Sequence, residues 1–101
     1  MDKRLKLQAI LEDLLGLQHV YYQPNESLKM EYPAIKYSVS NIESKFANNK
    51  KYSNITCYEV VVIDKMPDNE VIQKILELPL SYFDRHYVSD NLNHDSIILY
   101  Y

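Results

Sequence analysis

The chain of 101 residues is poor in glycine, cysteine and tryptophan. Its one glycine, Gly16, leaves no room for a glycine-rich phosphate loop or a dinucleotide-binding fingerprint. Its one cysteine, Cys57, forms no disulfide within the chain and supplies no zinc site alone. We expect Cys57 to be a small buried side chain in a strand, in a protein that folds in a reducing compartment.

The chain also lacks an excess of positive charge and a long apolar run. Its net charge of −3 comes from 11 Lys+Arg and 14 Asp+Glu, which argues against nucleic acid as the main ligand and against a polybasic membrane-surface protein. No segment approaches the roughly 20 apolar residues that span a bilayer. The N-terminal residues contain no signal-peptide core either. We therefore expect a protein with no membrane partner that stays inside the cell that makes it.

Apolar residues and tyrosines are abundant. Apolar residues make up 47% of the chain, which is typical of a globular protein, and the length suits one domain over residues 1–101. The chain has ten tyrosines, more than the core of so small a domain can hold. Because tyrosine packs through its ring while its hydroxyl stays hydrated, some of them are expected at the surface as an interface signal.

Apolar periodicity predicts two helices. Over residues 2–15 the apolar side chains recur every three or four positions and share one face, and Gly16 is placed to end the helix in the left-handed conformation. The second helix is predicted to begin at an N-cap, Asp68, and to end at Pro79.

Five further segments read as strands, at residues 17–23, 34–39 (or as far as 42), 55–64, 82–89 and 96–101. Residues 60–63 are all β-branched, so the third strand is expected at the centre of the sheet with both faces covered. Residues 43–54 are polar and read as a loop or as the outer arms of a long hairpin. The order α-β-β-β-α-β-β predicts an α+β fold: a mostly antiparallel sheet of about five strands with two helices packed on one face.

One hairpin holds the densest group of polar residues, namely Asp84, Arg85, His86, Asp90, His94 and Asp95. Histidines with carboxylates are the ligands of a zinc site, and strand alternation places Asp84 and His86 on one face. The simpler interpretation, which we prefer, is a solvated polar rim.

Three other groups of residues are candidates for chemistry or binding. Cys57 beside a histidine would make a nucleophilic pair, but no local signature supports it, and we expect Cys57 in the core. Asp64 and Lys65 end the central strand, and their simplest role is to start the next turn. Lys45, Phe46, Lys50, Lys51 and Tyr52 combine charge with aromatic rings. In an acidic chain we interpret these five as an interaction arm that contacts protein. We predict no catalytic residue, no metal and no cofactor.

Six short segments follow one another in a recognisable order: EYPAIKY at 31–37, ANNKKY at 47–52, YEVVVIDKMPD at 58–68, Leu78-Pro79, DRHY at 84–87 and DNLNHD at 90–95. In this order, and at this chain length, they resemble the tail-terminator, or tail-completion, proteins of long-tailed bacteriophages. Met66 departs from the pattern, because a polar turn residue is expected there.

The resemblance implies a structural virion protein and no enzyme. Such proteins form a ring, commonly a hexamer, that caps the head-proximal end of the tail tube. The ring stops tube polymerisation and presents a surface to the head connector. The arm would then reach a neighbouring subunit or the tube. The alternatives are another head–tail joining protein, a small metal-dependent enzyme using Asp84, His86 and His94, and a host-directed binding module.

Overall fold

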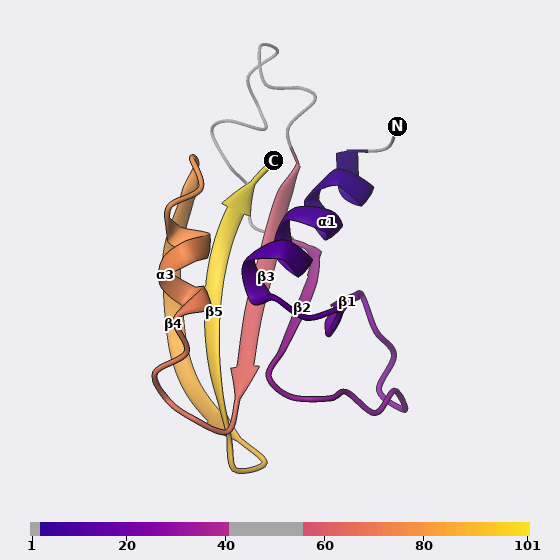
Figure 1. The fold of residues 1–101 in the computed structure, drawn as a ribbon, viewed down its shortest axis with the longest axis vertical. Helices are drawn as coiled ribbons and strands as arrows, with labels where there is room; N and C mark the ends of the chain where they lie inside the picture. Colours follow the sequence, from indigo (N-terminus) through magenta and orange to yellow (C-terminus); the bar gives the residue numbers. More distant parts are fainter. Residues whose placement is uncertain (1–2, 41–55) are drawn as a thin grey trace.

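The computed structural model describes residues 3–40 and 56–101 and shows an α+β fold with a five-stranded sheet (Figure 1). The elements are α1 (Lys3–Leu15), β1 (Val20–Tyr22), β2 (Ala34–Val39), β3 (Cys57–Asp64), α3 (Val71–Leu76), β4 (Ser81–Ser89) and β5 (Leu92–Tyr100). Both helices lie over the same face of the sheet (Figure 1). The predicted fold class and the placement of the helices on one face are confirmed.

The strand order is β1-β2-β3-β5-β4, and the sheet is mixed. Three of the four pairings are antiparallel, as expected, but β1 and β2 run parallel. They are parallel because residues 23–33 return the chain to the end of the sheet where β1 began, and β2 starts there (Figure 1). A tight hairpin would have started β2 where β1 stopped and made the pair antiparallel. Two further backbone bonds extend the pair: Ile35 N–H donates to the carbonyl of His19 at 2.9 Å, and Gln23 N–H donates to that of Tyr37 at 2.8 Å.

The main core lies between the helices and the sheet. Leu7 and Leu11 of α1 are fully buried, as the leucine spacing predicted, and α3 contributes Val71 and Ile75. The sheet supplies alternate residues of its central strands, namely Ile35, Tyr37, Tyr58, Val60, Val62, Ile97 and Leu99. The prediction that β3 would be central and apolar on both faces is confirmed, since Val61 and Ile63 on its other face are also buried.

Gly16 ends the first helix as predicted. Its φ is 78°, in the left-handed region that favours glycine, and its N–H donates to the carbonyl of Glu12 at 2.9 Å. The chain then turns before β1, so that strand begins at Val20 and not at residue 17.

The second helix begins later than predicted, at Val71, and Asp68 is not its N-cap. Glu70 stands at the N-cap position and makes no side-chain capping bond. Asn69, just before it, supplies that bond instead: its Oδ1 accepts from the N–H of Val71 at 2.9 Å, and its Nδ2 donates to Oδ2 of Asp64 at 2.7 Å. Asn69 therefore ties the end of β3 to the start of α3. Both asparagine and aspartate suit a cap, and the bond to Asp64 favours Asn69 here.

The last strand is longer than predicted and begins at Leu92 instead of residue 96. The reason is a tight turn in which Asp90 and Asn91 both have positive φ, at 53° and 62°. Two such residues make the hairpin turn whose twist matches the flanking strands. Leu92 therefore pairs directly with Ser89, and the four residues expected to be turn or loop join the sheet.

Tyr37 connects the sheet to α1 by polar contacts inside the core. It is 1% exposed; its hydroxyl donates to Oε1 of Gln8 and accepts from Nη1 of Arg4 at 3.4 Å. Its ring lies 5.0 Å from that of Tyr22. Burial raises the pKa of the Tyr37 phenol, and the nearby Arg4 guanidinium offsets only part of that rise.

The raised pKa of Tyr37 predicts a loss of stability at alkaline pH. The unfolded phenol loses its proton near pH 10 while the folded one still holds it, so the free energy of unfolding falls as pH rises from about 10 through the folded pKa. Tyr37→Phe should lower stability by about 1 kcal/mol at pH 8 and make the fall above pH 10 shallower. Urea unfolding from pH 8 to 11 measures both, with Tyr32→Phe, at an exposed tyrosine (38%), as the control. Parallel curves for wild type and Tyr37→Phe would contradict the assignment.

Candidate functional site

The two histidines of the β4–β5 hairpin lie on opposite faces of the sheet. His86 stands opposite Asp95, and Nδ1 of His86 lies 2.8 Å from Oδ1 of Asp95. His94 stands opposite Tyr87 in the next register position, and the two rings are stacked with their centroids 4.8 Å apart. Because neighbouring strand residues point to opposite faces, the His86–Asp95 pair faces the helices and His94 faces away from them.

Asp84 is separated from His86 by a β-bulge. Phe83 pairs with Ile97 and Arg85 with Ser96, so Asp84 is the additional residue between them. Its Oδ2 accepts from Oγ of Ser96 at 3.2 Å, on the face away from the helices. The expectation that Asp84 and His86 share a face was therefore wrong, because simple alternation holds only without a bulge.

The zinc hypothesis fails on this geometry. Asp84 and His94 lie on one face, and His86 lies on the other, so the hairpin does not bring the three ligands together. Across residues 3–40 and 56–101, no group of three or more His, Cys, Asp or Glu side chains is placed to hold a metal ion. The preferred interpretation, a polar rim, fits β4 and its turn, whereas His94 and Asp95 on β5 are buried.

Cys57 is a buried side chain, as expected, at 6% exposure beside Ile98 and Tyr100. His94 is opposite Ile63 at the other end of β3, roughly 20 Å away at about 3.3 Å per strand residue. His86 faces the other side of the sheet, and Nε2 of His19 lies 3.0 Å from Oε2 of Glu31. The described residues therefore form no Cys–His nucleophilic pair.

Asp64 has the structural role that we preferred. Its Oδ1 accepts from the N–H of Met66 at 3.1 Å, which shapes the turn after β3, and its Oδ2 accepts from Asn69. Both carboxylate oxygens are thus used within the chain. The interaction arm of Lys45, Phe46, Lys50, Lys51 and Tyr52 lies outside the described residues, and it stays a prediction.

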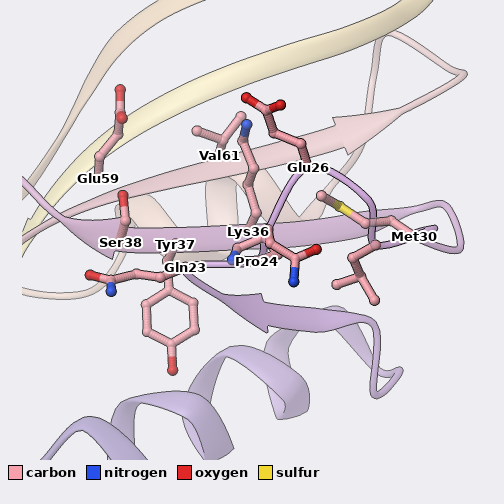
Figure 2. Close-up of a pocket in the computed structure, with 11 residues that line it drawn as sticks. Gln23, Pro24, Glu26, Met30, Lys36, Tyr37, Ser38, Glu59 and Val61 are labelled. Atoms are coloured by element: carbon pink, nitrogen blue, oxygen red, sulfur yellow. The ribbon is translucent and has the colours of Figure 1, made fainter.

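A small pocket lies on the sheet face away from the helices, with a volume of about 280 Å³. Lys36 and Ser38 of β2 and Glu59 of β3 project to this side, while Tyr37 points the opposite way, toward α1 (Figure 2). Glu26, from the loop before β2, completes the wall. The mixed charges suit a single polar side chain of a partner. No sequence pattern indicates this pocket, because it forms only when the loop of residues 23–33 folds over the sheet.

The most exposed surface of the sheet is its edge strand, β4. None of its nine residues is buried, and among the strands that the structure describes it pairs only with β5. Three large apolar residues are exposed on it: Tyr82 (46%), Phe83 (45%) and Val88 (64%). Exposed aromatic and apolar side chains along one edge are typical of a surface that another protein covers. The predicted exposure of some tyrosines is confirmed at Tyr82.

No protein-family model, curated protein or solved structure matches the chain. Neither helix in the described part of the chain has the length and apolar character needed to cross a membrane.

The separation of the two histidines predicts how the protein responds to zinc. We expect titration calorimetry with ZnCl₂ to show no stoichiometric binding, and His86→Ala and His94→Ala to match wild type. The His19→Ala variant serves as a control for scattered surface binding. Tight one-to-one binding that both hairpin variants abolish would contradict the geometry.

Proposed function

We propose that this chain is a structural assembly protein of a long-tailed bacteriophage, a tail terminator. Its copies form a closed ring on the head-proximal end of the tail tube, commonly a hexamer in the proteins that the sequence resembles. The ring stops tube polymerisation and offers a surface to the head connector. The observation that carries the proposal is β4, an edge strand exposed along its whole length.

The chemistry of β4 favours a specific protein contact over indiscriminate strand pairing. Tyr82, Phe83 and Val88 supply apolar area that a partner can bury. Asp84 and Arg85 place charge and a bulge in the middle of the strand, and both features hinder another strand from adding along the edge. The strand therefore presents its side chains to a partner more readily than its backbone.

A ring also suits the chain as an assembly unit. Repeated contacts between two different surfaces of one protein close into a ring when the rotation at each contact allows it. The arm, at Lys45, Phe46, Lys50, Lys51 and Tyr52, is proposed as a second contact, to the tube or to a neighbour. The proposal includes no catalytic step and places the protein in the virion.

Deletion of the gene from its parent phage tests the proposal directly. We expect electron microscopy of the lysate to show full heads separate from tails of abnormal, extended length, because nothing stops the tube from growing. Tails of normal length that fail to attach to heads would reassign the chain as another head–tail joining protein. Normal virions would overturn a role in assembly altogether.

Complementation of that deletion tests β4. Val88→Lys should fail to restore tails of normal length, because a charge in the middle of a buried contact is costly, while the isolated protein stays folded. The matched control is Val39→Lys, the same change at an exposed valine (46%) of β2. Infectious titre and tail length measure the result. Full restoration by Val88→Lys would remove β4 from the contact.

A further inference from the structure

A groove of about 580 Å³ lies between α3 and β4, on the face of the sheet that carries the helices. Its apolar lining consists of Ile72 and Leu76 of α3 and Phe83 of β4. Three carboxylates, Asp68, Glu70 and Asp95, also line it, and the last of them is bonded to His86. No Lys or Arg is among the described residues that line the groove. The groove therefore suits an apolar side chain that is accompanied by a positive charge.

Charge is divided unevenly along the chain. Residues 56–101, which form the groove, contain eight Asp+Glu and three Lys+Arg. Residues 3–40 contain five Lys+Arg and four Asp+Glu, and three of those positive residues fall within the first four positions of α1. One end of the molecule is thus complementary in charge to the groove.

The first turn of α1 combines the two properties that the groove requires. Leu5 is 47% exposed, and its neighbour Lys6 is also exposed. Positive side chains are unfavourable at a helix N-terminus, where the helix dipole already places positive charge. Arg4 has a reason within the chain, since its guanidinium lies 4.5 Å from the Tyr22 ring and binds Tyr37. Lys6 takes part in no ion pair between described residues.

We propose that the first turn of α1 of one copy docks into the α3–β4 groove of the next copy. Leu5 packs on Phe83 and Ile72, and the ammonium group of Lys6 lies among the carboxylates of the rim. This inference rests on the proposed ring, and it names the two surfaces that join its subunits. Phe83 of β4 lines the groove, so the same contact also covers part of that strand on the face that carries the helices.

The positions of the two surfaces favour a head-to-tail contact. The N-terminal end of α1 lies on one side of the molecule and points away from α3, while α3 and β4 lie on the opposite side (Figure 1). Two different, complementary surfaces on opposite sides generate a ring or a filament, and a two-fold dimer does not use them. In a closed ring each copy is held at two contacts, so a modest contact suffices.

Zero-length cross-linking of a mixture of unlabelled and ¹⁵N-labelled wild-type protein tests the contact. A carbodiimide joins a lysine to a carboxylate only when the two touch, and mixed-isotope peptides come only from different copies. We expect mixed-isotope products that join Lys6 to Asp68 or Glu70, with Lys29 and Lys36 absent from such products. Cross-links of Lys6 confined to one copy or to other carboxylates would overturn the contact.

Charge exchange supplies the matched variants. Lys6→Glu should weaken self-association about tenfold in sedimentation, and Asp68→Lys with Glu70→Lys should do the same. A mixture of these two variants should regain association. The control, Lys29→Glu, makes the same change of charge at an exposed site away from the groove and should behave as wild type.

The mass of the assembly as a function of concentration tests the contact between copies and the closed ring separately. A mass that reaches a plateau and responds to the exchanges supports both. A mass that rises without a plateau, yet responds to them, keeps the contact and overturns the closed ring of the proposed function. A plateau that the exchanges leave unchanged keeps the ring and overturns the contact. A monomer at every concentration, without mixed-isotope products, also overturns the contact.

Discussion

The structure depends on β3, which is hydrogen-bonded at both edges and covered on both faces. β2 and β5 pair with it in fixed antiparallel register. Val60 and Val62 face the helices and Val61 and Ile63 face the other side, and all four are at most 3% exposed. A strand with apolar residues on both faces is stable only in the interior of a sheet. Its neighbours must therefore cover it, and the less apolar strands are left for the edges.

The exposed edge follows from that arrangement. With β3 and β5 in the interior, β4 becomes the outermost strand beside α3 and carries Tyr82, Phe83 and Val88 at the surface. A small domain has too little interior to bury every apolar residue. Part of the uncovered apolar area lies on β4 and in the groove next to it, where a partner can cover it.

The polar hairpin shows how far proximity in sequence can differ from proximity in space. His94 and Asp95 are adjacent on β5, but alternation directs the first toward Tyr87 and the second toward His86 on the other face. The bulge at Asp84 then shifts the phase of β4 alone. A set of potential ligands within twelve residues of sequence is thereby divided between the two faces of the sheet.

Local patterns determined much of this fold. The leucine spacing and Gly16 placed α1, and the alternation from Ala34 and the β-branched run of β3 placed two central strands, because each signal is complete within a few residues. The cap by Asn69 uses Asp64, five residues earlier, and β5 begins at Leu92 because of the turn at Asp90 and Asn91, so local geometry decided both. The parallel pairing of β1 with β2, in contrast, depended on partners distant in sequence. The α3–β4 groove did too, since Asp68 and Phe83 come together only when helix and strand pack. Tertiary structure decided these features, because the contacts that stabilise them join segments whose local sequences are compatible with several arrangements.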